Sequence, residues 1–369
     1  MTGFEGLRVA LVGPVPPPSG GMANQTRQLM GLLKDAGASV EMVATNAPYR
    51  PAWAERLPFV RSLFRLAPYL LALWRAAGRA DLMHLMANSG WAWHLCAAPA
   101  IWVAHLRGCP VLVNYRGGEA AAFLLRSGRL VAFTLRRADA LLVPSGFLQA
   151  VFARHGMPAE ILPNVVDLQR FRPAPQLAAG AHLLVARNLE ALYDNATAIR
   201  ALALLRQHHP DARLTIAGTG PELARLQALV AELGQGEAVR FAGRLEREAM
   251  AELLRASTLC INPSLADNMP NSVLEALASG VPVLSTDVGG VPYLIEHERT
   301  ALLVAPGDPA AMAAALRRLL DDAALRDRLR EAGLAEVMRY TWARIGPQLS
   351  AFYRRSLNPS SSHRLARPS

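Results

Sequence analysis

The 369-residue sequence has few cysteines and almost no lysine. Its three cysteines, Cys96, Cys109 and Cys260, lie far apart in apolar surroundings. This pattern excludes a disulfide framework and a cysteine zinc cluster, and it favours a reducing compartment. Lys34 is the only lysine, so arginine carries nearly all of the positive charge. No apolar run reaches about 18 residues without a charge, so no transmembrane helix is expected.

The N-terminus also lacks a basic stretch followed by a long apolar run. We therefore expect no signal peptide, and we predict a cytoplasmic protein. Apolar residues make up 52% of the chain, and its length is enough for two domains with substantial cores. The chain is therefore expected to be globular.

Charge is unevenly distributed along the chain. Residues 1–174 hold 18 Lys and Arg against 9 Asp and Glu, whereas residues 175–344 hold 17 against 20. An anionic partner of the first half, either membrane lipid or a phosphorylated substrate, would explain this, but so would a merely arginine-rich surface. The segment 59–75, with Arg beside Phe, Leu and Trp, fits an interfacial membrane helix or a helix packed on its own sheet. No nucleic-acid-binding signature is present, so nucleic acid is not an expected partner.

Short β-branched runs alternate with helical stretches along the chain, a pattern typical of parallel α/β layers. The expected strands are 7–12, 39–44, 81–86, 110–114, 139–143, 160–162, 182–186, 213–217, 238–241, 258–262, 281–286 and 300–304. The expected helices are 21–35, 58–78, 90–107, 118–136, 146–155, 193–208, 220–234, 246–255, 272–279, 308–320 and 323–339. The proline-bearing stretch 167–180 reads as a linker between two such patterns.

Two Rossmann-like domains facing one another follow from this repetition, at residues 1–170 and 175–340. The amphipathic segment 341–357 is expected to be a helix that packs back on the first domain, and residues 358–369 are expected to be disordered. Ligands of doubly wound sheets bind at the carboxyl ends of the strands, so we expect the active site in the cleft between the domains.

Glycine-rich turns follow two of the expected strands. Gly20 and Gly21 precede a helix, and Gly218-Thr219-Gly220 precede another, so backbone N–H groups could face an anion at either place. Simple tight turns would look the same. The spacing of the first loop is not GxGxxG, which argues against a nicotinamide or flavin cofactor. Arg187, directly after a strand, could hold a diphosphate or be a solvated surface charge.

The stretch "DNMPNSVLE" places Asp267 and Glu275 on either side of a helix start. Ser272 and Glu275 have the spacing of a capping box, which would explain Glu275 without a ligand. That interpretation leaves Asp267 unexplained, along with the glycine pair Gly289-Gly290 that follows. A ligand whose hydroxyl groups bind the two carboxylates is the alternative.

This region, "SLADNMPNSVLEALASGVPVLSTDVGGVPYLIEHERTALLVAPGD", resembles the donor-binding segment of retaining family 4 glycosyltransferases, which have the GT-B fold. The stretches "GPVPPPSGGM", "LLVPSGFLQAVFARHG", "ILPNVVDLQRFRP", "VARNLE", "LTIAGTGPELARL" and "VRFAGRL" are similar to further parts of the family, in the same order. The resemblance spans nearly the whole chain.

The resemblance implies a role for each site residue. Asp267, where the family usually has Glu, would bind donor-sugar hydroxyls, Glu275 the ribose, and Arg187 the diphosphate leaving group. Gly20 and Gly21 would approach the diphosphate from the other domain. The remaining residues expected near the donor are Gly218, Thr219, Gly220, Gly243, Arg244, Asn268, Met269, Pro270, Asn271 and Ser272. UDP is favoured over GDP as the nucleotide.

Three departures from the family concern the diphosphate and acceptor sides. The family's Lys after the Arg is missing, Arg116 stands about where an N-domain His falls, and Tyr293 replaces an acid. Arg116 could supply positive charge, and Glu119 could contact the acceptor. We therefore expect catalytic roles for Arg187, Asp267, Arg116 and Glu119, without a metal or cofactor; the adjacent acids Asp321-Asp322 read as a helix cap or a solvated turn.

The predicted function is sugar transfer, with retention of configuration, from a nucleotide sugar to a lipid-linked or polysaccharide acceptor in cell-surface glycan synthesis. An anionic surface on the inner face of the cytoplasmic membrane is a possible partner. A non-catalytic GT-B homologue serving as a partner subunit, and a nucleotide-sugar epimerase, remain alternatives.

Overall fold

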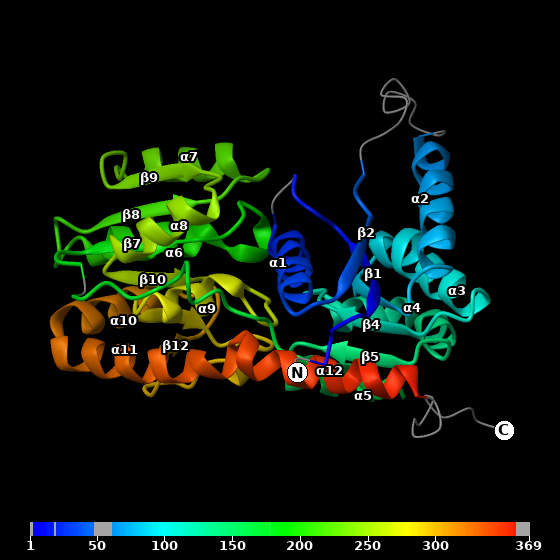
Figure 1. Cartoon of the computed structure of the whole chain (residues 1–369). Helices are drawn as coiled ribbons and strands as arrows, with labels where there is room; N and C mark the ends of the chain where they lie inside the picture. The colour runs from blue at the N-terminus through cyan, green and yellow to red at the C-terminus, as the bar shows by residue number, and fades with distance from the viewer. Residues whose placement is uncertain (1–2, 18–19, 48–60, 177, 359–369) are drawn as a thin grey trace. The chain divides into compact units, whose positions relative to one another are not determined.

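The computed structural model describes residues 3–17, 20–47, 61–176 and 178–358. The chain divides into two compact units (Figure 1). Unit 1 comprises Met1–Asn164 and Trp342–Ser369, and unit 2 comprises Val165–Thr341. Unit 2 is therefore a continuous segment, whereas unit 1 is assembled from both ends of the chain.

Unit 1 contains a six-stranded parallel sheet in the order β2-β1-β3-β4-β5-β6. Its strands are β1 (Arg8–Gly13), β2 (Ser39–Ala44), β3 (Leu82–Ala87), β4 (Val111–Tyr115), β5 (Ala140–Val143) and β6 (Glu160–Ile161). Strand β1 pairs with β2 along one edge and with β3 along the other. The switch point of this sheet, where doubly wound folds collect ligands, therefore lies between β1 and β3.

The helices of unit 1 cover this sheet. They are α1 (Gly21–Asp35), α2 (Arg61–Ala77), the π-helix η2 (Trp93–Ala97), α3 (Ala98–Leu106), α4 (Ala120–Leu135), α5 (Gly146–Ala153) and α12 (Trp342–Leu357). Helices α2, α3 and α4 lie side by side, while α12 packs against β3 and β4. The predicted helix 90–107 is thus interrupted by one π-helical turn.

Unit 2 contains a second six-stranded parallel sheet, in the order β12-β11-β10-β7-β8-β9. Its strands are β7 (His182–Val185), β8 (Arg213–Ala217), β9 (Val239–Gly243), β10 (Leu259–Asn262), β11 (Val283–Thr286) and β12 (Leu302–Val304). After β9 the chain crosses to the far side of β7, so the switch point lies between β7 and β10.

Helices flank this sheet as well (Figure 1). They are η3 (Ala191–Tyr193), α6 (Asn195–Leu205), α7 (Leu223–Glu232), α8 (Arg247–Arg255), α9 (Asn271–Ala278), η4 (Val291–Tyr293), α10 (Pro309–Asp321), α11 (Ala323–Val337) and η5 (Met338–Tyr340). Helices α6, α7 and α10 pack together, and α9 packs against α11. Each expected strand lies on a strand of the structure, which confirms two Rossmann-like α/β units.

The strands are apolar because both sheets are covered on both faces. Strands β3, β4 and β10 are buried at every position, as expected for parallel sheets that have helices on both sides. Two of the buried strand positions in unit 1 are polar: His84 and Asn114 are fully buried within β3 and β4. A buried polar side chain must find a hydrogen-bond partner, so these two positions indicate a specific internal network.

The expected linker belongs largely to unit 2. Val166 and Phe171 lie in the core beneath α9, and the Val166 amide donates to the Tyr340 carbonyl oxygen at 2.9 Å. The structure therefore places residues 165–170 in unit 2. Of the segment 358–369, predicted to be disordered, residues 359–369 lie outside the described residues, as do residues 58–60 of the expected second helix.

Within the described ranges, no helix is both long and apolar enough to cross a bilayer.

Candidate functional site

The carboxyl ends of β7 and β10 bring Arg187 and Asp267 together, although the two residues are 80 positions apart. The strands are hydrogen-bonded neighbours, and the switch point of the sheet lies between them. Arg187 Nη2 donates to Asp267 Oδ2 at 2.5 Å. Only 11% of the Arg187 side chain and 13% of the Asp267 side chain is exposed. Two predicted site residues thus form a nearly buried ion pair.

The Arg187 guanidinium is held from a second side by an aromatic ring. Its Cζ lies 4.0 Å from the ring centroid of Tyr193 in η3, a cation–π arrangement that orients a planar guanidinium. Its Nε is buried and has no hydrogen-bond partner. The residue therefore keeps an unused donor after pairing with Asp267, which suits a group that acquires a further anionic partner.

The loop that carries Asp267 is fixed by hydrogen bonds to both carboxylate oxygens. Ser264 Oγ donates to Oδ2 at 3.3 Å, and the Asn268 amide donates to Oδ1 at 3.0 Å. The Gly290 amide donates to the Asp267 carbonyl oxygen at 2.9 Å. A Cβ on Gly290 would lie 2.0 Å from the Asn268 carbonyl oxygen. The second glycine pair therefore serves to let two loops approach closely.

The Gly218-Thr219-Gly220 turn packs in the same way against the segment that carries Arg187. A Cβ on Gly218 would lie 2.0 Å from the Arg187 carbonyl oxygen. The Leu189 amide donates to the Thr219 carbonyl oxygen at 3.1 Å. Thr219 and Gly220 are exposed, with Gly218 partly so. The turn therefore lies beside Arg187, at the same edge of the sheet.

The start of α9 is not closed by the capping box. Pro270 occupies the N-cap position and no side chain caps the helix, which begins at Asn271. Ser272 is instead the second helical residue, and its Oγ is buried without a hydrogen-bond partner. The capping interpretation of Ser272 and Glu275 is therefore wrong, because the helix begins two residues earlier than that motif requires. A helix N-terminus without a cap, carrying a buried unused hydroxyl, is suited to an anion.

Glu275 lies in a cluster separate from Asp267. Arg247 Nη2 is 4.0 Å from Glu275 Oε1 and also 4.0 Å from Asp167 Oδ2. Arg170 Nη1 in turn pairs with Asp167 at 2.6 Å. Burial raises the pKa of Glu275 to about 7, although Arg247 opposes the shift. This carboxyl group therefore changes charge near neutral pH.

The other predicted donor residues lie along the same edge of unit 2. Asn268, Met269 and Pro270 are buried in the loop before α9, and Asn271 is partly exposed. Gly243 ends β9 with a positive φ of 67°, and Arg244 after it is exposed.

Three residues that sequence reasoning missed are Tyr193, Asp167 and Arg247. Asp167 and Arg170 have the i,i+3 spacing of an ion pair, which was the available signal. Nothing in the sequence around Arg247 or Tyr193 indicated their partners, because the partners are distant in sequence or set by loop geometry.

The predicted residues of unit 1 lie at the carboxyl ends of β1 and β4. Gly20 is the N-cap of α1, without a side-chain cap. Glu119 is the exposed N-cap of α4, also without a side-chain hydrogen bond to the helix. Arg116 follows β4, and its Nε donates to Asn114 Oδ1 at 2.7 Å. Burial lowers the pKa of Arg116 to about 9.

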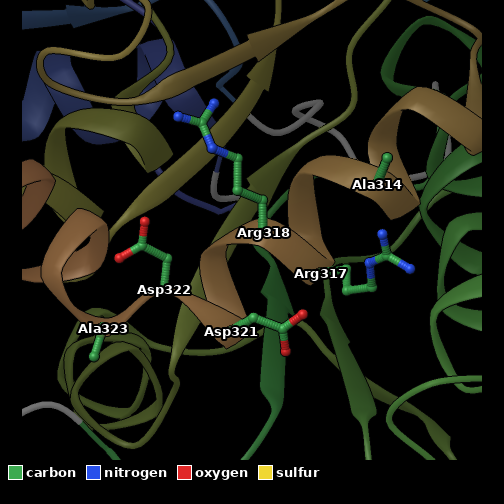
Figure 2. A pocket seen from close by; sticks show the side chains of 6 residues that line it. All are labelled: Ala314, Arg317, Arg318, Asp321, Asp322 and Ala323. Carbon is green, nitrogen blue, oxygen red and sulfur yellow. The ribbon is translucent and has the colours of Figure 1, made fainter.

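A surface pocket at the junction of α10 and α11 is distinct from these residues. Figure 2 shows its lining, which includes Arg317, Arg318, Asp321 and Asp322. Asp322 Oδ1 accepts from the Leu325 amide at 2.9 Å and so caps α11. The adjacent acids therefore lie at a helix junction, as predicted. The described residues contain no group of three His, Cys, Asp or Glu side chains able to hold a metal ion.

Comparison with known families identifies both units. Residues 181–335 match the family described as Glycosyl transferases group 1, and residues 20–165 match the Glycosyl transferase 4-like domain. The chain belongs to the group 1 glycosyltransferases. The family that "DNMPNSVLE" and its neighbouring stretches resemble is thereby confirmed.

Several relatives of this group 1 glycosyltransferase are D-inositol 3-phosphate glycosyltransferases. That of Streptomyces avermitilis is 34% identical over 233 residues, covering 58% of this chain and 49% of the relative. That of Streptomyces coelicolor is 29% identical over 341 residues, covering 80% of this chain and 73% of the relative. The matched region thus spans about half of the first relative's length and nearly three quarters of the second's.

Solved structures confirm the GT-B fold of this group 1 glycosyltransferase. Sucrose-phosphate synthase from Thermosynechococcus elongatus superimposes with a TM-score of 0.76 at 22% identity, covering 96% of this chain and 100% of that one. Anabaena HepE, in complex with UDP and glucose, gives a TM-score of 0.74 at 19% identity, covering 94% and 98%.

Proposed function

We propose that this protein is a retaining glycosyltransferase that takes a sugar from a nucleotide-diphosphate sugar, UDP-linked in preference to GDP-linked. The observation that carries the proposal is the Arg187–Asp267 pair at the switch point of unit 2, beside the uncapped start of α9. HepE, of the same fold, is seen with UDP and glucose. A cation, a helix N-terminus and a carboxylate together suit a diphosphate and an attached sugar.

Each group has a distinct task in this proposal. The departing diphosphate gains negative charge as the anomeric carbon–oxygen bond breaks, and Arg187 and the α9 N-terminus stabilise that charge. Asp267 accepts hydrogen bonds from sugar hydroxyls, and ionised Glu275 accepts them from the ribose. Stabilisation by these groups requires no divalent metal. Arg116 and Glu119 act on the acceptor side, where positioning provides much of the rate.

We further propose a lipid-linked or polysaccharide acceptor in cell-surface glycan synthesis, reached from the cytoplasmic side of the membrane. The support is a face of unit 1 that we call the candidate membrane face, formed by the exposed side chains of α2, α3 and α4. The sequences of these three helices contain no acidic residue. Trp74, Leu106 and Phe133 are 45%, 67% and 48% exposed.

Arginines lie among these apolar side chains. The Arg107 guanidinium is 4.9 Å from the Trp74 ring, and that of Arg137 is 3.7 Å from the Trp102 ring. Aromatic and aliphatic groups beside arginine suit the headgroup layer of an anionic bilayer. Co-sedimentation with phosphatidylglycerol vesicles tests this face. Trp74→Glu should abolish binding, whereas Met338→Glu, at an equally exposed position of unit 2, should not.

The catalytic proposal is tested by screening nucleotide sugars for thermal stabilisation and then analysing products. Transfer should need both donor and acceptor, and Asp267→Ala or Glu275→Ala should abolish it. The acceptor panel should include inositol 3-phosphate, for which the Streptomyces relatives are named. Inversion of one stereocentre of the donor sugar in the absence of an acceptor would indicate an epimerase. A wild-type protein that binds donors and turns over none would indicate a non-catalytic partner subunit.

A further inference from the structure

Unit 1 contains a chain of four polar side chains that runs from α12 through the sheet to its carboxyl edge. Tyr353 Oη lies 3.0 Å from His84 Nδ1, and His84 Nε2 lies 3.0 Å from Asn114 Nδ2. Asn114 Oδ1 accepts from Arg116 Nε at 2.7 Å. Tyr353, His84 and Asn114 are fully buried. These hydrogen bonds therefore connect α12 to Arg116, the residue that follows β4.

The hydrogen bonds that link these four side chains can have only one direction of donation. Arginine has only donors, so the Asn114 oxygen must face Arg116 and its NH2 group must face His84. Burial lowers the pKa of His84 to about 3, so the ring is neutral and carries one proton. Because Nε2 accepts from Asn114, that proton is on Nδ1 and is donated to Tyr353 Oη. This arrangement fixes the Arg116 guanidinium through its Nε.

The outer edge of the Arg116 guanidinium has no partner among the described residues. Its Nη1 is buried and makes no hydrogen bond. Its Nη2 also makes none and is not among the buried unpartnered atoms, so it reaches solvent. No carboxylate of the described residues lies within 4.0 Å of this cation. A partly buried, fixed guanidinium without a counter-charge is costly unless an anion completes it.

Other polar groups lie at the same carboxyl edge of the sheet. Ser89 Oγ and Tyr115 Oη are 2.7 Å apart at the ends of β3 and β4. A Cβ on Gly117, next to Arg116, would lie 2.3 Å from Ser89 Oγ and 2.7 Å from Asn88 Oδ1. Glycine at 117 thus keeps the backbone close to these hydroxyl and amide groups. Arg116 is the cation of a polar edge that could bind a sugar-like substrate.

We propose that Arg116 is an anion-binding residue, which takes a phosphate or carboxylate group of a substrate on its Nη1–Nη2 edge through two parallel hydrogen bonds. The proposal rests on the transferase function proposed above and narrows it, since at least one substrate must present an anion to unit 1. That anion comes either from the nucleotide diphosphate or from an acidic acceptor, and Asn114, His84 and Tyr353 position the guanidinium that binds it.

Thermal unfolding of the full chain, with anions at matched ionic strength, tests the proposal. Residues 165–341 contain no tryptophan, so tryptophan fluorescence follows unit 1. The ligands are UDP against uridine, and glucose 6-phosphate and glucuronate against glucose. We expect Arg116→Gln to weaken the binding of whichever anion stabilises the wild type, by about thirtyfold. Arg136→Gln, at an exposed position of the same unit, is the matched control and should bind as the wild type does.

The outcomes distinguish the two sources of the anion. Loss of the UDP effect alone assigns Arg116 to the donor diphosphate, whereas loss of the glucose 6-phosphate or glucuronate effect assigns it to an acidic acceptor. Equal stabilisation of wild type and Arg116→Gln by every anion, or stabilisation of neither by any, overturns the proposal. Arg116→Lys provides a second variant if the glutamine variant does not fold; it keeps the charge without the two parallel donors and should bind about tenfold more weakly.

The positioning role has its own measurement. Tyr353→Phe removes the acceptor of the His84 proton, so it should weaken anion binding about threefold in the wild-type background. In the Arg116→Gln background it should change binding by nothing further. Equal weakening in both backgrounds would show that Tyr353 acts only on the packing of α12. The transferase proposal would fail by a different observation: neither the wild type nor the Arg116 variants would bind any nucleotide sugar.

Discussion

Glu275 should make the stability of unit 2 depend on pH in the opposite sense to an ordinary glutamate. Its pKa lies at about 7 in the folded protein against an ordinary value of 4.5. Between these pH values the native state binds more protons than the unfolded chain, so the free energy of unfolding falls as pH rises. The shift corresponds to about 3 kcal/mol, fully lost above the folded pKa. Burial is the cause, since the side chain is only 22% exposed.

Glu275→Gln tests this reasoning because glutamine keeps the shape and removes the titration. We expect the variant to match the wild type near pH 5 and to exceed it by about 2 to 3 kcal/mol at pH 8. Urea unfolding followed by far-ultraviolet circular dichroism, at several pH values, gives the difference. Glu246→Gln, at an exposed position just before Arg247, is the control. A difference between Glu275→Gln and wild type that stays constant from pH 5 to 8 would refute the assignment.

The same titration should govern donor binding. If only the ionised carboxylate accepts the ribose hydroxyls, UDP-glucose affinity should rise about tenfold between pH 6 and pH 8. UDP-glucose is the suitable ligand because its diphosphate does not titrate in this range. Calorimetry measures the affinities, and a flat profile would show that Glu275 does not contact the nucleotide.

Three further predictions concern the neighbouring groups of unit 2. Asp267→Asn removes the counter-charge of Arg187, so UDP should bind about tenfold more tightly while transfer is lost. Weaker UDP binding would mean that Asp267 orients the guanidinium and does not compete with the diphosphate for it. Ser272→Ala removes a buried unpartnered hydroxyl, so the unfolding free energy should change by less than about 1 kcal/mol while UDP affinity, measured by calorimetry, falls about tenfold. Gly290→Ala places a Cβ 2.0 Å from a backbone oxygen and should lower the unfolding free energy by about 3 kcal/mol or more, whereas Gly236→Ala, with open space around it, should change it little.

The sheets could be predicted from sequence because their strands are apolar runs of the right length. Strands 39–44 and 213–217 agree residue for residue with β2 and β8. The placement of Arg187 and Asp267 at one edge also followed, since each lies in the loop after a strand of a parallel sheet. Periodicity and turn residues therefore determine which residues reach the edge of each sheet.

The pairing of the site residues could not be predicted in the same way. Whether Arg187 contacts Asp267 or solvent depends on strand order, which places β7 beside β10 and so brings together two residues that are 80 positions apart. The capping motif at Ser272 failed because a shift of two residues in the helix start changes which side chain reaches the first amides. The isolation of the Arg116 guanidinium reflects the absence of nearby carboxylates, which no local pattern records.

The contact of α12 with β3 and β4 has a consequence for how the protein is made. Unit 2 is complete once residue 341 has been synthesised, whereas unit 1 still lacks the helix that carries Tyr353. The second unit can therefore fold without α12, whereas the first then lacks the Tyr353 partner of its His84 ring. A chain truncated after residue 341 should accordingly present a protease-resistant unit 2 attached to a protease-sensitive unit 1.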